Sequence, residues 1–388
     1  ALPLTEVAFA AGFGSVRRFN AAFIERMGKS PSLLRRAHVV ETPQGLTLRL
    51  DYRAPYAWTE ILGFLAARAV PGIEIVANDT YRRNVRLGAH VGSIAIRRAP
   101  SRDSLLLTLA PTLIPALMPL VAHVRRMFDL DARPDVIARV LGADPVLAPL
   151  VRAQPGLRLP GAIDPFEASV RALLGQQISV AAATTLAGRF AAKFGTPHDG
   201  GDGLERVFPT AAEVAARSVD TIAKIGLPGA RAAALHGFAT ALANGTLKLG
   251  GELDAFVAAA VALPGIGPWT ANYLAMRALH LPDAFPAADL GIKKALAATP
   301  REAERRAEAW RPFRSYAVMH LWSSLGGKND GDDANDVLPA RSAAPVRARG
   351  RADRRVPAGA DAALARRDRG KRARARRDRG AAARVLRR

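Results

Sequence analysis

Hydrophobic and polar positions alternate with a period of two through much of the segment from residue 45 to 130. Such alternation predicts strands with one buried face, and the apolar stretches between them predict helices. The expected strands cover 46–52, 81–88, 90–98 and 104–110, and the expected helices cover 57–68 and 113–127. We therefore expect an α+β layer built on a small antiparallel sheet.

From residue 131 to 327 the pattern has the period of helices, broken by loops rich in proline and glycine. Two of these loops, 226–231 and 263–268, place Leu-Pro-Gly directly before a helix, and two copies are too few to indicate a solenoid repeat. We expect an all-α domain. Its predicted helices cover 165–174, 178–193, 211–217, 229–244, 253–262, 269–279, 290–297, 301–310 and 312–325.

Residues 1–36 predict two short helices, and Ser15 is placed to cap the second of them. Positions one turn apart on a helix share a face. The second helix is therefore expected to turn Phe19 and Phe23 toward a core and Arg17 and Arg18 toward solvent.

The charge balance points to a polyanionic partner, because 56 Lys and Arg face 34 Asp and Glu, a net charge of +22. Nucleic acid and an anionic membrane surface both fit this charge. Residues 328–388 are polar and then rich in arginine and alanine without apolar periodicity, which predicts a basic disordered tail. Non-specific binding of nucleic acid and an incidental solvated extension are both consistent with that tail.

Composition also excludes several kinds of chemistry. The chain has no cysteine, which rules out disulfides, thiolate zinc sites, cysteine-ligated clusters and cysteine nucleophiles. No His, Asp or Glu cluster has the spacing of a catalytic metal site, and His280 and His320 are expected to stand alone on helices. The apolar run 105–124 is interrupted by three prolines, so we expect no membrane span and a cytoplasmic protein.

The segment "LPGIGPWTA" (263–271) predicts a sharp turn between two helices. Gly265 and Gly267 suit positions where a side chain would clash or where φ is positive, and Pro268 suits the first turn of the next helix. The unpaired N–H groups at the start of that helix would bind a phosphate. A plain corner between helices has the same composition, so this alternative stays open.

The residues around this turn resemble a known family. "LPGIGPWTANYLAMRAL" (263–279), followed by "DAFPAADLGIKKAL" (283–296), is similar to the helix-hairpin-helix of the DNA glycosylase superfamily. Four further segments resemble its AlkA-type, 3-methyladenine DNA glycosylase II branch: 124–137, 155–179, 226–235 and 310–322. The resemblance implies a TATA-binding-protein-like sheet domain over 45–130, followed by a helix-hairpin-helix glycosylase domain over 131–327.

The N-terminal segment "LTEVAFAAGFGSVRRFNAAFIERMGKSPSLLRR" resembles the second helix-turn-helix of AraC-type transcription factors. The resemblance implies a partial DNA-binding domain over 1–38, with Arg17 and Arg18 on the helix that enters the major groove. Such a segment ahead of a glycosylase resembles bacterial fusions of the Ada alkylation sensor with AlkA. A small helical cap with solvated arginines is the alternative.

By position in the motif, the resemblance identifies Asp289 as the catalytic carboxylate. Its structural alternative is an ordinary helix N-cap, and the two roles are compatible. A helix N-terminus favours the ionised carboxylate, which this reaction requires. Removal of a base from deoxyribose develops positive charge on the sugar, so a neighbouring carboxylate stabilises the transition state, activates the attacking water, or does both.

Three aromatic residues, Trp269, Tyr273 and Trp322, are expected to form the base pocket. Alkylated purines such as 3-methyladenine and 7-methylguanine are cationic, and stacking on electron-rich rings stabilises them by roughly 0.5–2 kcal/mol. Trp269 also stands where strand-cleaving relatives carry a lysine nucleophile, and an indole cannot form a Schiff base. The sequence therefore predicts a monofunctional enzyme. Core packing is the alternative for Trp269 and Trp322.

The remaining site residues are implied by the resemblance alone. Gln177 takes the wedge position that fills the gap left by a flipped base, where some members have leucine, which fills space better than glutamine. The alternative is that Gln176 and Gln177 simply cap the helix that begins near Ile178. The hairpin is expected to contact DNA through Gly265, Ile266, Gly267 and Thr270. Backbone carbonyls of Val261, Leu263 and Ile266 would hold a structural Na⁺ or K⁺, and no other cofactor is expected.

The sequence thus predicts a monomeric, monofunctional glycosylase that removes alkylated bases from duplex DNA. Two rivals stay open. One is an AraC-type or Ada-type regulator with an inert glycosylase body, and the other is a glycosylase that also cleaves the strand.

Overall fold

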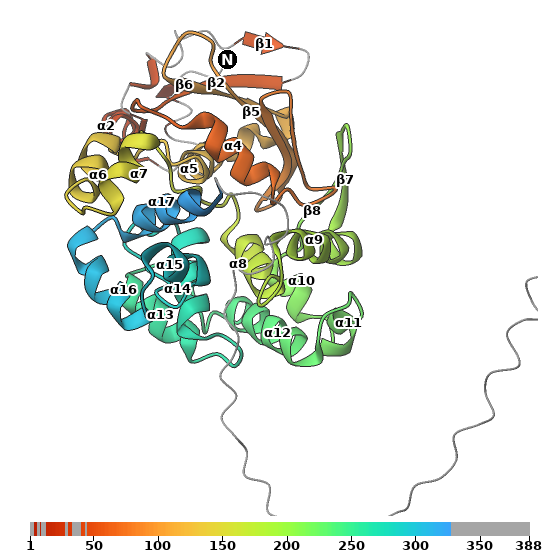
Figure 1. The fold of residues 1–388 in the computed structure, drawn as a ribbon. Helices are drawn as coiled ribbons and strands as arrows, with labels where there is room; N and C mark the ends of the chain where they lie inside the picture. The colour runs from red at the N-terminus through yellow and green to blue at the C-terminus, as the bar shows by residue number, and fades with distance from the viewer. Residues whose placement is uncertain are drawn as a thin grey trace, which may run out of the picture. The chain divides into compact units, whose positions relative to one another are not determined.

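The computed structural model describes residues 4, 5, 8, 13–27, 30–32, 40–42 and 45–326. The basic tail predicted over 328–388 lies outside the described residues. In the described part, a six-stranded antiparallel sheet precedes a predominantly helical region, which confirms the expected α+β class (Figure 1).

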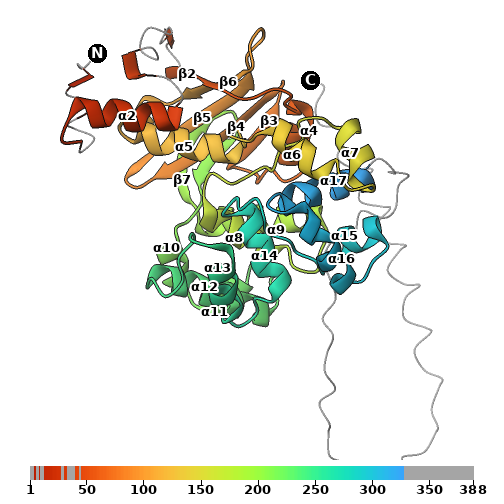
Figure 2. The same cartoon turned by 90° about the vertical axis from the view of Figure 1, so that its left-hand side faces the viewer.

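The sheet has the strand order β1-β2-β6-β5-β4-β3, and all neighbouring pairs are antiparallel. Side chains alternate between its faces, so β5 buries Ile94 and Ile96 while Ala95 between them is less buried. Two helices, α4 and α5, pack on the buried face, as Figure 2 shows for α5. The bounds are β1 Val40–Thr42, β2 Gly45–Asp51, β3 Glu74–Ala77, β4 Thr80–Leu87, β5 His90–Arg98, β6 Ser104–Leu109, α4 Trp58–Ala66 and α5 Leu117–Met127.

The helical region surrounds a second apolar core. All nine helices expected after residue 164 are present, with ends within a few residues of the predicted ones. The bounds are α8 Pro165–Leu174, α9 Val180–Phe194, α10 Ala211–Ala215, α11 Val219–Ala223, α12 Gly229–Ala243, α13 Leu253–Val261, α14 Pro268–Arg277, α15 Leu290–Leu296, α16 Pro300–Ala307 with the 3₁₀ turn η2 Glu308–Trp310, and α17 Arg314–Gly326.

Several elements were not expected from the pattern: β1, β3, the 3₁₀ turn η1 Pro111–Ala116, the helices α6 Pro134–Leu141, α7 Leu147–Ala153 and α11, and the hairpin of β7 Thr196–Gly201 and β8 Leu204–Val207. The β7–β8 hairpin is polar and rich in glycine, so it has no apolar alternation. Tertiary contacts hold it instead, because Asn84 Nδ2 on β4 donates to the carbonyls of His198 and Arg206.

Near the N-terminus, α2 spans Val16–Met27. The backbone N–H of Arg18 donates to Ser15 Oγ at 3.2 Å, which confirms the expected cap. Phe19 is buried against Phe13 and Phe23, while Arg17 and Arg18 are exposed as expected. A role of this helix in a DNA groove stays a prediction.

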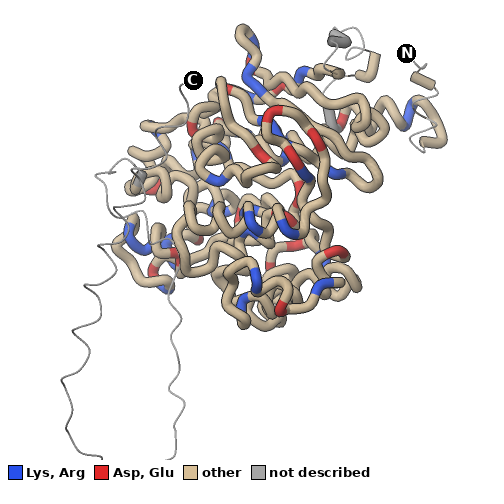
Figure 3. Tube along the Cα trace, turned by 90° about the vertical axis from the view of Figure 1, so that its right-hand side faces the viewer, with Lys and Arg blue, Asp and Glu red and all other residues tan. Residues whose placement is uncertain are grey.

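Within the described residues, no helix has both the length and the apolar character needed to cross a bilayer. Lysine and arginine are interspersed with aspartate and glutamate along the trace in Figure 3.

Candidate active site

Asp289 lies directly before α15 and is fully buried. Its Oδ1 accepts a hydrogen bond from the backbone N–H of Ile292 at 3.1 Å, so the side chain caps the helix. The N-cap interpretation is therefore confirmed, and it leaves the second carboxylate oxygen free for other partners.

Two tryptophans complete the environment of this carboxylate. Trp322 Nε1 on α17 donates to Asp289 Oδ1 at 2.8 Å, and Trp269 Nε1 on α14 donates to Oδ2 at 3.3 Å. Tyr273 stacks on Trp269, with ring centroids 5.2 Å apart, and lies 6.3 Å from the ring of Trp322. The fold thus brings together the carboxylate and the three aromatic residues that the sequence singled out. All three rings are half-buried.

Burial raises the pKa of Asp289 above the ordinary value, against the hydrogen bonds donated by Trp322, Ile292, Trp269 and Gly291, which lower it. The amides of the helix N-terminus favour the ionised form, as expected, and burial, which the sequence did not indicate, outweighs them in the net direction of the pKa. The donors do favour the carboxylate, but they do not offset its removal from water.

Gly291, in the first turn of α15, sets how closely Trp322 approaches Asp289. A Cβ at this position would lie 2.9 Å from Trp322 Cδ1 and 3.1 Å from Asp289 Oδ1. Nothing in the local sequence pattern indicates this role of Gly291, because its constraint comes from α17, which lies about 30 residues later in the chain.

The hairpin between α13 and α14 differs at its two glycines. Gly265 has φ +85°, and a Cβ there would lie 2.5 Å from the Cβ of Ala234 on α12, so this position meets both expected reasons for glycine. Gly267 has extended backbone, and a Cβ there would meet nothing within 4 Å. The fold therefore does not require glycine at 267, in contrast to the expectation.

Among the described residues, no side chain caps α14, whereas Pro268 occupies its first turn as predicted. The N–H groups of that turn remain available to an anion. Two other hairpin residues expected at DNA have buried side chains, Ile266 at 4% and Thr270 at 5% exposure. Either of them would reach DNA through its backbone.

The loop between α8 and α9 carries the two glutamines. Gln177 is exposed and has φ +60°, an uncommon conformation for a residue other than glycine. Gln176 turns inward, and its Nε2 donates to Gly265 O at 3.3 Å and to Thr270 Oγ1 at 3.2 Å. Neither glutamine caps the next helix, because Ser179 Oγ accepts from Ala182 N and α9 begins at Val180. The capping alternative is wrong.

Comparison with known proteins identifies the family. The model of the AlkA N-terminal domain matches residues 47–164, and that of the HhH-GPD superfamily base excision DNA repair proteins matches residues 170–312. The chain is 39% identical over 285 residues to "DNA-3-methyladenine glycosylase 2" of Escherichia coli, an alignment that covers 72% of this chain and 98% of that protein. The chain belongs to the AlkA-type HhH-GPD glycosylases.

A second relative of this family is longer. The chain is 41% identical over 338 residues to the "Probable bifunctional transcriptional activator/DNA repair enzyme AlkA" of Mycobacterium tuberculosis. This alignment covers 84% of this chain and 67% of that protein. Among solved structures, the 3-methyladenine DNA-glycosylase from Archaeoglobus fulgidus shares the fold, with a TM-score of 0.62 at 20% identity over 71% of this chain and 97% of that one. The first family match runs past residue 130, and the predicted domain boundaries stay a prediction.

In this AlkA-type chain, α4 of the sheet region also contacts α14, the helix that carries Trp269 and Tyr273. Phe64 packs against both cores. The guanidinium carbons of Arg68 and Arg277 lie 3.9 and 4.5 Å from its ring centroid. Burial lowers the pKa of Arg277 to about 10, and a favourable electrostatic contact with Tyr273 opposes that shift. Sequence reasoning missed these residues, because only the packing of α4 against α14 brings them together.

For the cation expected at the hairpin, the donor chemistry fits, since carbonyl oxygens are the ligands that a hard cation prefers. Leu263 O already accepts from Ile266 N at 3.2 Å, and a carbonyl has a second lone pair for a metal. Val261, Leu263 and Ile266 would hold the ion, which would bridge the hairpin to a phosphate. This site stays a prediction.

The described residues contain no cluster of three or more His, Asp or Glu side chains suited to a metal. Contrary to the expectation, His280 does not lie on a helix. It lies in the loop after α14 at φ +58°, with Nε2 3.3 Å from Asp129 Oδ1. His320 lies on α17, and burial lowers its pKa to about 4.

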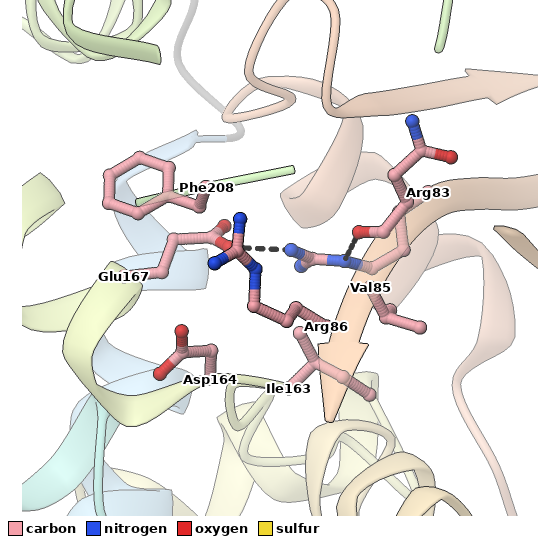
Figure 4. A pocket seen from close by; sticks show the side chains of 8 residues that line it. Arg83, Val85, Arg86, Ile163, Asp164, Glu167 and Phe208 are labelled. Atoms are coloured by element: carbon pink, nitrogen blue, oxygen red, sulfur yellow. Dashed lines mark hydrogen bonds and ion pairs between the residues drawn. The ribbon is translucent and has the colours of Figure 1, made fainter. Parts of the chain in front are cut away.

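A separate cluster of buried charges joins the sheet to α8. Arg83 Nη2 on β4 lies 2.5 Å from Glu167 Oε2, and Arg83 Nη1 lies 3.2 Å from Glu74 Oε1. Arg171 pairs with the same two glutamates, at 2.9 Å to Glu74 and 3.3 Å to Glu167. Figure 4 shows the guanidinium of Arg83, on the sheet side, pointing toward Glu167 on the helical side. These charges satisfy one another, so the cluster fixes α8 on the sheet and does not resemble a base pocket.

Proposed function

We propose that this chain is a monofunctional DNA glycosylase that hydrolyses the N-glycosidic bond of alkylated bases in duplex DNA and leaves an abasic site. The proposal rests chiefly on one observation: a buried carboxylate, Asp289, is held by two indole N–H groups beside three neighbouring aromatic rings. Family membership supplies base excision repair as the biological context.

In the proposed reaction, Asp289 acts while ionised. As the base departs, the deoxyribose becomes cationic, and a carboxylate in a site shielded from water stabilises that charge far more than it would in bulk solvent. The same oxygen pair can orient the attacking water. Trp269 and Trp322 fix the direction of the carboxylate through their N–H groups, so little reorganisation is needed during the reaction.

The aromatic cluster accounts for the proposed preference for alkylated bases. An N-alkylated purine carries positive charge, and the faces of Trp269 and Tyr273 offer it a cation-π contact. All three rings are half-buried, so part of their surface stays open to a base. No lysine occupies the position of Trp269, so we propose hydrolysis by water without strand cleavage.

A regulator with an inert glycosylase body is the second candidate, favoured by the relative whose name includes a transcriptional activator. An abasic-site assay on methylated duplex DNA separates the two. Excision that survives deletion of residues 1–36 and is lost in Asp289→Asn supports the enzyme. Full binding to a specific sequence without any base release supports the regulator.

We expect the pH dependence of excision to follow the raised pKa of Asp289. Ionisation is required, so the rate should fall as the pH drops, with a midpoint above the roughly 3.9 of an ordinary aspartate. Trp322→Phe removes a donor that lowers this pKa, and it should move the acidic limb of the pH–rate profile to higher pH.

The matched control is Trp310→Phe, which also removes an indole donor from a carboxylate, that of Asp144, outside the site. This variant should leave the acidic limb in place. An unchanged limb in Trp322→Phe would show that the pKa of Asp289 does not govern the rate.

A third expectation concerns the hairpin. Gly267→Val should weaken binding to undamaged duplex DNA of any sequence, because phosphate contacts carry no base information, and it should leave stability unchanged since a Cβ there meets nothing. Gly265→Ala should instead destabilise the fold, because its Cβ would meet Ala234 at a positive φ. Equal binding by wild type and Gly267→Val, measured by fluorescence anisotropy, would remove this part of the hairpin from the DNA interface.

A further inference from the structure

Gln176 links two loops that are far apart in the sequence. Its side chain starts from the α8–α9 loop, and its Nε2 donates to Gly265 O and Thr270 Oγ1 of the hairpin and the helix after it, 89 and 94 residues away. Thr270 is 5% exposed, so this contact lies at the edge of the interior. The two loops are therefore joined by side-chain hydrogen bonds at the point where both reach the surface.

The parts on either side of this link are already fixed. The hairpin packs tightly on α12, since a Cβ added at Gly265 would lie only 2.5 Å from the Cβ of Ala234. On the other side, Ser179 caps α9 just after the glutamines. Between these supports, Gln177 has a left-handed backbone conformation and an exposed side chain, whereas the side chain of Gln176 is half-buried and hydrogen-bonded. The adjacent glutamines thus have different environments, which suits them to separate tasks.

We propose that Gln176 is a positioning residue for base extrusion: it fixes the loop that carries Gln177 at a constant distance from the phosphate-binding hairpin. This inference rests on the proposed function. Extrusion of a base requires that the backbone be held while a side chain enters the gap in the stack. If the two loops moved independently, ordering them would cost part of the free energy of DNA binding, and less of it would be available to extrude the base.

The link also depends on the amide. Only the Nε2 group of Gln176 can donate to both acceptors, one of which is a carbonyl. A glutamate at this position would place a carboxylate oxygen against Gly265 O. Gln176→Glu should therefore behave like Gln176→Ala or worse, although it preserves the size of the side chain.

The test compares one lesion in two contexts. A duplex with a single 7-methylguanine opposite cytosine requires full unpairing, whereas the same strand with the lesion opposite thymine is extruded more easily. Single-turnover excision by Gln176→Ala should be slower by about tenfold on the paired lesion, as expected for the loss of one or two hydrogen bonds, and close to wild type on the mismatched one. Binding to undamaged duplex should be unchanged.

Two further variants keep the test decisive. Thr270→Val removes one acceptor and should show a smaller loss with the same dependence on pairing, which addresses the inference even if Gln176→Ala is unstable. Thr184→Val removes a hydroxyl on α9 that donates to Val180 O within the same helix, and the variant should excise both substrates as wild type does.

Equal losses on the two substrates, or no loss on either, would overturn the inference while leaving the proposed function intact. A wild-type chain that is inactive on both substrates would overturn the proposed function and this inference with it.

Discussion

Asp289→Asn is expected to reduce base excision by about 10²- to 10⁴-fold, the range found when a catalytic acid-base group or a preorganised charge is removed. Asparagine keeps the shape of the side chain, and its Oδ1 can still accept from Trp322 Nε1 and Ile292 N. Its Nδ2 would face the N–H of Trp269, so the second tryptophan loses its acceptor. Binding to duplex DNA should survive, because the hairpin is untouched.

The same variant should not lower the free energy of unfolding at neutral pH. Burial raises the pKa of Asp289 in the folded protein, so the folded state prefers the protonated side chain more than the unfolded state does. Stability from this group is therefore greatest below the unfolded pKa and falls as the pH rises through the folded one. Asparagine has no charge to bury. A catalytic residue that opposes stability is expected where function determines the residue type.

Single-turnover base release and urea denaturation at pH 7 measure the two effects on the same samples. Asp254→Asn, the same change at an exposed position of α13, is the control and should alter neither quantity. Excision by Asp289→Asn at the wild-type rate would remove this carboxylate from the mechanism. A large loss of stability without loss of the intrinsic rate would assign it to capping alone.

Arg83→Met should destabilise the protein by about 3–5 kcal/mol, the usual cost of removing one partner from a buried charge cluster. The Arg83, Glu74 and Glu167 side chains are at most 4% exposed. Without the guanidinium, two carboxylates would share one remaining cation, Arg171, in a site with little water. Because α8 leads directly into the glutamine loop, we also expect slower excision on paired lesions.

Arg133→Met provides the matched control, because Arg133 forms an ion pair with Asp135 in which both side chains are more than half exposed. This variant should leave the denaturation midpoint unchanged. A loss of less than about 1 kcal/mol in Arg83→Met would mean that the two glutamates become protonated or solvated at little cost, and that the cluster does not hold α8 on the sheet.

The sequence predicted those parts of the fold that depend on local patterns. Alternation located β4, β5 and β6, and the helical period with proline and glycine breaks located the helices from α8 to α17 except the short α11. The cap at Asp289 and the contact of Trp269 with Tyr273 were also predictable, because one helical turn separates the two rings. Each of these inferences used residues that are close in the chain.

The remaining features depend on contacts between distant segments. Phe64 contacts Arg277 on α14 from the sheet region, and the β7–β8 hairpin is held by Asn84 across more than 100 residues. The net direction of the pKa of Asp289 depends on its burial in the folded protein. Periodicity carries no information about such pairings, so the sequence identified the site residues without their burial or their mutual distances.

The most direct test of the central claim is the identity of the products that the wild-type chain releases from DNA treated with a methylating agent. We predict free 3-methyladenine and 7-methylguanine, an intact strand with abasic sites, and no covalent adduct after borohydride treatment. Absence of any released base would contradict the glycosylase assignment, and a trapped adduct would contradict hydrolysis by water under the control of Asp289.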